Sequence, residues 1–138
     1  MKQALKSTLS VILIAVTLLS LFACAASDPW ADATYTSDTS LGEGATTFTF
    51  KVRAEDKTVT FTVSTDKQTV GEALLELGLI SGSVESYGLY VKEVNGIRAD
   101  YDKDGYYWAL YIGSEYASLG VDSTAVTPGA EYTFAREK

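Results

Sequence analysis

The middle of the chain carries two stretches in which apolar and polar residues alternate. The first covers residues 46–54 and the second residues 58–63, and the polar turn Glu55-Asp56-Lys57 separates them. Because successive side chains of a strand point to opposite faces, the alternation predicts two strands, each with one apolar face. The short turn predicts an antiparallel hairpin. The residues expected on its buried face are Phe48, Phe50, Val52, Ala54, Val59, Phe61 and Val63.

After the hairpin, the spacing of apolar residues becomes helical. The apolar residues at positions 70, 74 and 77 are four and three residues apart, which places them on one face of a helix. Thr69 and Glu72 have the spacing of a capping box, and Gly78 is a natural helix end. The sequence therefore predicts one short amphipathic helix.

Three later stretches are rich in aromatic and β-branched residues, as strands are. They cover residues 87–94, 106–112 and 132–135, with turn signals at Asn95-Gly96, Gly113-Ser114 and Pro128-Gly129. The order is strand, strand, helix and then several strands. This order predicts an α+β fold, in which a β-grasp-like antiparallel or mixed sheet is crossed by a single helix.

The first 23 residues have the pattern of a secretory signal. Two lysines precede an apolar run over residues 9–22. The run ends in Leu21-Phe22-Ala23-Cys24, which resembles the lipobox of bacterial lipoproteins. The resemblance implies that residues 1–23 are a lipoprotein signal peptide and that Cys24 is the lipidation site. The alternative is a plain secretory signal followed by an incidental cysteine.

A lipid on Cys24 would hold the protein at the extracytoplasmic face of the cell membrane, because two or more acyl chains give stable anchoring. The next residues are rich in Ala, Ser, Thr, Asp and Gly and contain few apolar side chains. Such a segment buries too little apolar surface to offset its ordering entropy. We therefore predict a flexible tether over residues 24–44 and a folded domain over residues 45–138.

The chain is acidic and contains no histidine. It has 18 Asp and Glu against 11 Lys and Arg, and loss of the signal segment with its two lysines leaves 9 minus 18, a net charge of −9. This charge repels phosphate backbones, so we expect no nucleic-acid partner. Without histidine there is no Ser-His-Asp triad, and with one cysteine there is no intramolecular disulfide or cysteine-based zinc site.

Three aspartates stand at alternate positions, Asp100, Asp102 and Asp104, and Gly105 follows them. This pattern matches the first half of a calcium loop, because Ca²⁺ takes several oxygen ligands and the glycine permits a sharp bend. Counted from Asp100, however, position 12 is Tyr111 and not the glutamate that completes such a loop. The alternative is an acidic β-turn. Ca²⁺ is thus a candidate cofactor, and no other cofactor is expected.

The aromatic strand over residues 106–112 is the candidate ligand site. Strand alternation places Tyr107 and Tyr111 on one face, and Trp108 on the opposite, more apolar face. Aromatic rings with polar tips suit stacking on planar ligands and protein interfaces, although ordinary cross-strand packing would use the same residues. The candidate ligand-binding residues are Tyr107, Trp108, Tyr111 and Tyr116. No pattern of acids and bases indicates catalysis, so we expect no enzymatic activity.

Several of these motifs together resemble the DUF4430 domain, which is related to the C-terminal β-domain of transcobalamin and intrinsic factor. The resemblance covers residues 46–136, and its most specific parts are the helix opening Thr69-Val70-Gly71-Glu72, the turn Val94-Asn95-Gly96 and the pair Tyr107-Trp108. Family members usually carry Val-Asn-Gly after the aromatic strand, where this chain has Ile112-Gly113-Ser114.

The resemblance implies a compact β-grasp-like domain without catalytic machinery. In the cobalamin carriers, this domain closes over a corrinoid that a separate helical domain holds. We therefore expect a membrane-anchored, extracytoplasmic binding module for a small planar ligand such as a corrinoid. The alternative is a protein-interaction or surface-assembly module that calcium stabilises, with an extracytoplasmic protein as its partner.

Overall fold

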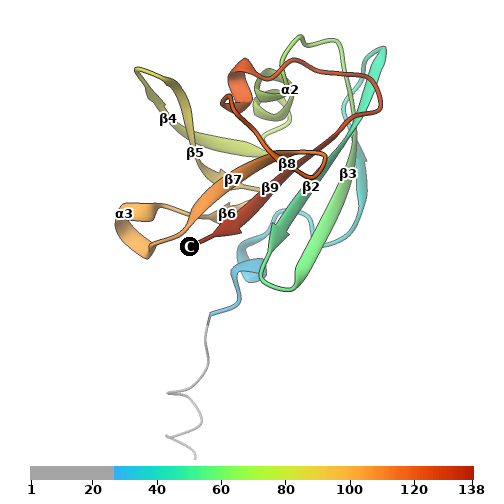
Figure 1. The fold of residues 1–138 in the computed structure, drawn as a ribbon. Coiled ribbons are helices and arrows are strands. Elements are labelled where there is room, and N and C mark those ends of the chain that lie inside the picture. The colour runs from blue at the N-terminus through green and yellow to red at the C-terminus, as the bar shows by residue number, and fades with distance from the viewer. Residues whose placement is uncertain (1–26) are drawn as a thin grey trace, which may run out of the picture.

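The computed structural model describes residues 27–138, which form two β-sheets around a shared core (Figure 1). The larger sheet has six strands in the order β1-β3-β2-β9-β7-β8, and the smaller has three in the order β4-β5-β6. The larger sheet consists of β1 (Thr39–Leu41), β2 (Thr46–Ala54), β3 (Lys57–Thr65), β7 (Tyr107–Ile112), β8 (Glu115–Tyr116) and β9 (Glu131–Glu137). The smaller consists of β4 (Ile80–Glu85), β5 (Gly88–Val94) and β6 (Ile97–Arg98).

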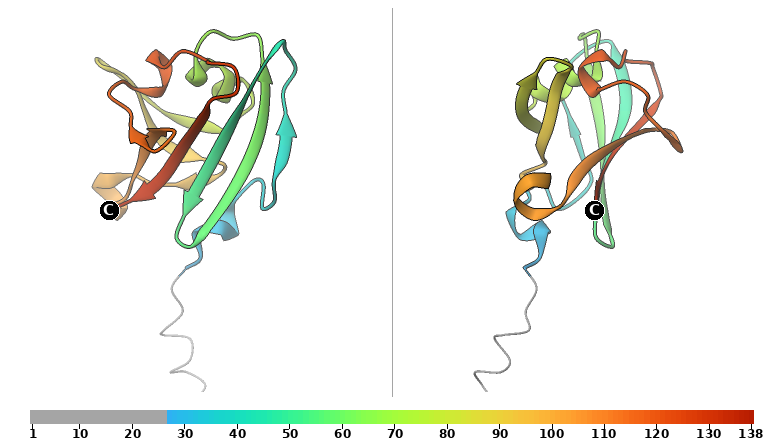
Figure 2. Two further views of the ribbon diagram at one scale, coloured as in Figure 1. Left: turned by 45° about the vertical axis from the view of Figure 1, so that its right-hand side comes forward. Right: turned by 60° about the vertical axis from the view of Figure 1, so that its left-hand side comes forward.

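In the described residues, four short helical elements accompany the sheets: η1 (Pro29–Asp32), α2 (Val70–Glu76), α3 (Tyr101–Asp104) and η2 (Val121–Ser123). The two sheets form separate layers, with α2 and η2 at one end and η1, α3 and the C-terminus at the other (Figure 2). The larger sheet is mixed, because β1 runs parallel to β3 and β9 parallel to β2. The α+β class expected from the sequence is confirmed.

The β2–β3 hairpin forms in the expected register, with Phe50 opposite Phe61. All seven residues expected on its buried face are at most 1% exposed. The rings of Phe50 and Phe61 are stacked with their centroids 5.8 Å apart, and Phe134 of β9 meets Phe50 edge-on at 6.1 Å. Burying side chains of this size contributes about 1.5–3 kcal/mol each. The hairpin is therefore the main source of apolar burial in the larger sheet.

The predicted helix is α2, and its start is capped as the sequence indicates. The hydroxyl of Thr69 accepts a hydrogen bond from the backbone N–H of Glu72 at 3.2 Å, which satisfies one of the free donors of the first turn. Gly78 follows the helix at φ +68°, in the left-handed region where glycine carries no steric cost. Val70, Ala73 and Leu74 are buried.

The second layer contains two strands that the sequence does not predict, β4 and the two-residue β6. The predicted strand over residues 87–94 is β5, and it turns into β6 through Asn95 and Gly96, both at positive φ (52° and 80°). On its other side β5 pairs with β4, whose residues alternate poorly and are mostly exposed apart from Ile80. Weak alternation and exposure explain why β4 leaves little signal in the sequence.

Residues 28–44 depart from the flexible tether expected over residues 24–44. Trp30 is only 7% exposed, and its Nε1 donates a 2.9 Å hydrogen bond to the carbonyl of Ala54. The ammonium of Lys57 lies 4.9 Å from the centre of the Trp30 ring. Farther along, β1 pairs with β3 as an edge strand of the larger sheet. Residues 24–26 of the expected tether lie outside the described residues.

A buried asparagine fixes the same segment from the other layer. The side-chain amide of Asn95 accepts from the backbone N–H of Tyr35 at 2.9 Å and donates to the carbonyl of Tyr35 at 2.8 Å. The ring of Tyr35 meets Phe61 edge-on at 5.5 Å. The few apolar residues of the segment thus suffice to dock it, because partners distant in sequence also satisfy its backbone polar groups.

The predicted signal peptide and the lipidation site Cys24 lie outside the described residues. Within residues 27–138, the structure has no helix that is both long and apolar enough to span a membrane.

Candidate functional site

Strand β7 carries the candidate ligand-binding residues, and its alternation separates them. Trp108 and Leu110 point into the core and are each 7% exposed. Tyr107 and Tyr111 lie on the outer face of the larger sheet and are partly exposed. Alternation places Ile112 on the same face as Trp108, but Ile112 lies at the end of the strand and is 42% exposed. The structure therefore brings Tyr107 and Tyr111 together and places Trp108 behind them.

On the outer face, one carboxylate holds both tyrosines. The hydroxyl of Tyr111 donates a 2.7 Å hydrogen bond to one oxygen of Glu137, and the hydroxyl of Tyr107 donates to the other at 3.3 Å. Glu137 lies directly opposite Tyr107 on β9. The guanidinium of Arg53, on β2, lies 5.7 Å from the centre of the Tyr111 ring. This arrangement fixes the two rings by their polar tips and by a cation.

The contact with Glu137 changes the acidity of both phenols. The pKa of Tyr111 lies above its ordinary value of 10.0, mainly because of the hydrogen bond to Glu137 and then because of burial. The pKa of Tyr107 is also raised, first by burial and then by the Glu137 charge. A raised pKa keeps the phenol protonated, so both hydroxyls stay donors at neutral pH. Stability from this contact is complete below pH 10 and is lost as the pH rises through the raised pKa.

Strand β8 adds the third tyrosine. Tyr116 pairs with Tyr111 across the β7–β8 turn, and the two rings meet edge-on with centroids 5.6 Å apart. Tyr116 is 64% exposed. Beside Tyr111, a hollow of about 420 Å³ opens on the outer face. It is lined by Lys51, Arg53, Thr58, Tyr111, Gly113, Ser114, Glu131 and Thr133.

One edge of β7 is only partly paired. The backbone of Gly113 donates to Glu131 on β9, whereas the carbonyl of Leu110 accepts from Ala117 on the opposite side. Because backbone groups alternate between the two edges of a strand, the N–H and C=O of Trp108 point to the same side as the Leu110 carbonyl. On that side β8 pairs only with Tyr111 and Ile112. Within residues 27–138, no strand pairs with Trp108 on this open edge.

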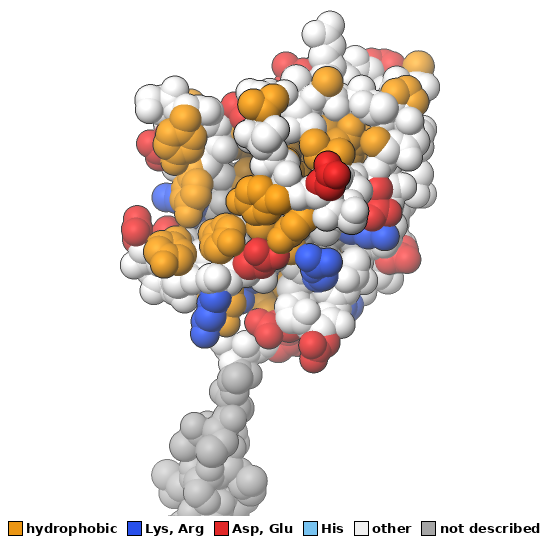
Figure 3. Space-filling model, in the orientation of Figure 1, with side chains coloured by type: hydrophobic (Ala, Val, Ile, Leu, Met, Phe, Trp, Pro, Cys, Tyr) orange, Lys and Arg blue, Asp and Glu red, His pale blue; other side chains and the backbone are white. Residues whose placement is uncertain are grey.

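A groove lies between this open edge and β5. Its volume is about 280 Å³. Tyr116 and the loop that leads to η2 form part of its lining. The groove is lined by Leu89, Tyr90, Val91, Trp108, Leu110, Tyr116, Ala117, Ser118, Leu119, Gly120, Val121 and Phe134. In the space-filling view, hydrophobic side chains gather on this side of the molecule, over β5, α3 and β7 (Figure 3).

The indole N–H of Trp108 is buried without a hydrogen-bond partner. Among residues 27–138 it is the one buried side-chain nitrogen or oxygen in this condition. The other tryptophan, Trp30, donates from its Nε1 to the carbonyl of Ala54. Buried polar groups are nearly always paired, so the unpaired N–H of Trp108, a residue that lines the groove, is an exception in this part of the chain.

The three aspartates of the proposed calcium loop do not converge on one point. They form α3 and its N-terminal end, where Asp100 is 6% exposed and lies 3.8 Å from the ammonium of Lys92. The carboxylate of Asp104 accepts from the backbone N–H of Tyr106 at 2.8 Å and of Asp100 at 3.2 Å. Asp102 is exposed on the helix. In the described part of the chain, no group of three or more His, Cys, Asp or Glu is placed to hold a metal ion. The geometry favours the acidic-turn interpretation.

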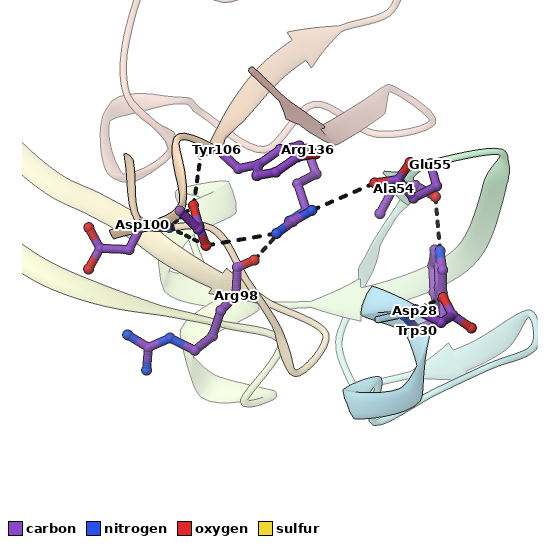
Figure 4. A network of polar contacts seen from close by, with 9 residues as sticks. Asp28, Trp30, Ala54, Glu55, Arg98, Asp100, Tyr106 and Arg136 are labelled. Atoms are coloured by element: carbon purple, nitrogen blue, oxygen red, sulfur yellow. Dashed lines mark hydrogen bonds and ion pairs between the residues drawn. The ribbon is translucent and has the colours of Figure 1, made fainter. Parts of the chain in front are cut away.

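Asp104 instead belongs to a network centred on Arg136 of β9 (Figure 4). The Nε of Arg136 donates a 2.8 Å hydrogen bond to the carbonyl of Arg98, and its terminal nitrogens lie 3.7 Å from Glu55 and 3.8 Å from Asp104. Its guanidinium lies 3.8 Å from the centre of the Tyr106 ring. One side chain thus links β9 in the larger sheet to β6 in the smaller sheet and to the segment at α3.

Together, these features define an α+β domain whose aromatic strand is paired along one edge and largely open along the other. The family model "Domain of unknown function (DUF4430)" matches residues 67–138, which are 72 of the 138 residues. The chain therefore belongs to the DUF4430 family. The β2–β3 hairpin lies outside this match, although the sequence resemblance begins at Thr46.

The solved structures that are similar to the chain include the following two. One is a protein of Ruminococcus gnavus ATCC 29149 described as a "putative metal binding protein", with 26% identity, a TM-score of 0.64, and coverage of 68% of this chain and 98% of that one. The other is haptocorrin in complex with Cbi, with 22% identity and a TM-score of 0.57. That match covers 67% of this chain but only 25% of haptocorrin, and it shows a shared fold. No curated protein matches the chain.

Two residues of the outer face were not found from the sequence. Glu137 and Arg53 hold the tyrosines, but they lie on β9 and β2, far from β7 in the chain. The signal for Glu137 is the alternation of the last strand, in which positions 131, 133, 135 and 137 share one face. That alternation becomes informative only once the register of β9 against β7 is known.

Glu137→Gln should lower the pKa of Tyr111 toward 10.0, because the substitution removes the carboxylate that favours the neutral phenol. The pKa of Tyr107 should fall less, since burial is the larger cause of its shift. Titration of ¹³Cζ-labelled tyrosine by NMR measures both values.

Glu131→Gln is the matched control, because Glu131 lies on the same strand face but pairs with Lys51 at 2.9 Å. It should leave the Tyr111 titration unchanged. An unshifted Tyr111 pKa in the Glu137→Gln variant would contradict the assigned contact.

Proposed function

We propose that this protein is a non-catalytic binding module that holds a small planar ligand against the tyrosines of β7 and β8. A second part of the proposal places it at the extracytoplasmic face of the cell membrane, anchored by a lipid on Cys24. The observation that carries the ligand-binding part is the Tyr111–Tyr116 pair. Tyr111 is held in place, whereas Tyr116 presents an open ring surface that is 64% exposed.

The surroundings of this pair suit a flat ligand. Tyrosine and tryptophan offer large contact areas at low entropic cost, and their polar tips add hydrogen bonds. Hollows lie on both sides of the pair, because Tyr111 lines the outer one and Tyr116 lines the groove against β5. Lys51 and Arg53 in the outer hollow can donate hydrogen bonds to acceptor atoms at the edge of a ligand.

The descriptions of the two similar structures both refer to binding, but to different kinds of ligand. The name of the Ruminococcus gnavus protein points to a metal, whereas haptocorrin binds Cbi. We favour an organic ligand for this chain, because the carboxylates of Asp100 and Asp104 at α3 already serve Lys92, Arg136 and backbone amides. We propose no catalysis, because the carboxylate nearest the tyrosines, Glu137, accepts hydrogen bonds from both of them.

The anchor proposal gains a geometric consequence from the docked Trp30. Because the carboxylate of Asp28 already accepts a hydrogen bond from the backbone N–H of Trp30, only three residues separate Cys24 from the fixed part of the domain. The four steps from residue 24 to residue 28 span roughly 14 Å in an extended chain. An anchored protein would therefore keep η1, α3 and the β2–β3 turn near the lipid headgroups and point α2 away from them (Figure 1).

The open edge of β7 favours a second candidate function, a protein-interaction module. An unpaired strand edge accepts an extended segment of a partner through backbone hydrogen bonds. Exposed aromatic residues, including Tyr87 and Tyr101, lie in or beside the elements around this edge, β5 and α3. Capture of an extended peptide with no response to planar ligands would favour this candidate.

Tyr116→Ala should weaken binding of a planar ligand by about tenfold, because one open aromatic surface is lost. The measurement is titration of the protein with Cbi and a panel of planar aromatic compounds, followed by intrinsic tryptophan fluorescence. Tyr87→Ala is the control, since Tyr87 is 75% exposed and lies in the β4–β5 turn. A flat response to every compound, or equal losses in both variants, would contradict the small-ligand function.

Cys24→Ser should abolish acylation and move the protein from the membrane fraction to the soluble fraction of the secreting cell, because a serine hydroxyl does not form the thioether. Mass spectrometry of the N-terminal peptide and membrane fractionation measure the two effects. An unmodified Cys24 in the wild-type protein would leave the plain secretory signal as the explanation.

A further inference from the structure

The groove between β5 and β7 has an uncharged lining. None of the residues that line it is Asp, Glu, Lys or Arg. Burying an ionised group there would remove its hydration without a counter-charge, which is strongly unfavourable. The groove therefore discriminates against charged ligands and suits a neutral one, in contrast to the outer hollow with its Lys51 and Arg53.

Trp108 brings an unpaired hydrogen-bond donor to this site. Trp108 is 93% buried, since 7% of it is exposed, and its Nε1–H has no partner among the described residues. An indole N–H donates only, so its partner must be an acceptor. The main-chain N–H and C=O of the same residue face the open edge of β7. A carbonyl oxygen or a ring nitrogen of a ligand is the kind of group that would satisfy the indole N–H.

The size of the groove limits the ligand further. Its volume of about 280 Å³ lies at the lower end of small-molecule sites, which begin at about 300 Å³. A compound with one or two rings is the appropriate size. Tyr116 stands at the groove and meets Tyr111 of the outer face, so a ring in the groove would be continuous with the exposed tyrosine surface.

We propose that the β5–β7 groove binds a small, neutral, ring-containing group that accepts a hydrogen bond from the Nε1–H of Trp108. This inference deepens the proposed function, because it names the chemical class of the ligand and the subsite that receives it. It excludes a carboxylate or phosphate as the group that enters the groove.

The chain supplies its own internal reference for a test. It has two tryptophans, and Trp30 lies at the other end of the domain with its N–H already bonded to Ala54. In a ¹⁵N-labelled protein, each indole N–H gives one NMR signal. A ligand in the groove should move the Trp108 signal downfield and leave the Trp30 signal in place.

Three one-ring probes separate the requirements of the groove. Acetophenone carries a neutral acceptor, ethylbenzene has a similar shape without one, and benzoate adds a charge. Acetophenone should shift the Trp108 signal in a saturable way. Ethylbenzene should bind about threefold to tenfold more weakly, which corresponds to one hydrogen bond, and benzoate should not bind in the groove.

Two variants test the role of the donor. Trp108→Phe keeps a ring but removes the N–H, so the preference for acetophenone over ethylbenzene, measured by ligand-observed NMR, should disappear. Ser118→Phe narrows the groove from an exposed loop position and leaves Trp108 unchanged. It should prevent the acetophenone-induced shift even if Trp108→Phe does not fold.

The proposal is overturned if acetophenone leaves the Trp108 signal in place, if both indole signals move alike, or if ethylbenzene binds as well as acetophenone. These results are separate from the test of the proposed function. Loss of planar-ligand binding in Tyr116→Ala without any Trp108 response would retain the tyrosine surface and reject the groove. A Trp108 response without an effect of Tyr116→Ala would retain the groove and reject the tyrosine surface.

Discussion

The pairing of β7 determines how the rest of the candidate site is built. The strand is hydrogen-bonded to β9 from Tyr107 to Ile112, whereas β8 covers only its last two residues on the other side. Strand alternation then sends two tyrosines outward and Trp108 inward. Because β5 lies beside the uncovered part without pairing to it, a groove remains where a further strand would otherwise fill the sheet.

A few specific contacts hold the two layers together at the end of the domain that carries η1 and α3. Arg136 reaches from β9 to the carbonyl of Arg98 and to Asp104, and it stacks on Tyr106. At the same end, the Trp30 indole is bonded to Ala54. The contacts of Arg136 involve a charged group and are stronger than neutral hydrogen bonds, and both sets of contacts join segments distant in sequence. Because these contacts hold the two layers together at this end, the layers do not need hydrogen bonds between β5 and β7 across the groove.

Features that depend on local sequence were predicted well. The β2–β3 hairpin follows from alternation, and the start of α2 follows from the Thr69 cap that the structure contains. Asn95 shows the limit of this reasoning. Its turn conformation is visible in the Asn-Gly pair, but its side chain also binds the backbone of Tyr35, sixty residues away. Without that long-range partner, residues 28–44 have the composition of a tether, which is why their docking was not predicted.

The same limit applies to the site. Alternation correctly separated Trp108 from Tyr107 and Tyr111, but the roles of Glu137 and Arg53 depend on the order and register of strands from both ends of the domain. The aspartates show a further limit of residue spacing. Their spacing matches a calcium loop, yet a turn of α3 directs Asp100 toward Lys92 and Asp104 toward Arg136. Residue spacing indicates which ligands are available, and only the backbone path decides whether they converge.

The most direct measurement of the central claim is amide hydrogen exchange along β7 in the free protein. The backbone N–H of Ala109 should be strongly protected because it faces β9, whereas that of Trp108 should exchange much faster because it faces the open edge. Equal, strong protection of both amides would show that the edge is paired, and the account of the groove would then be wrong.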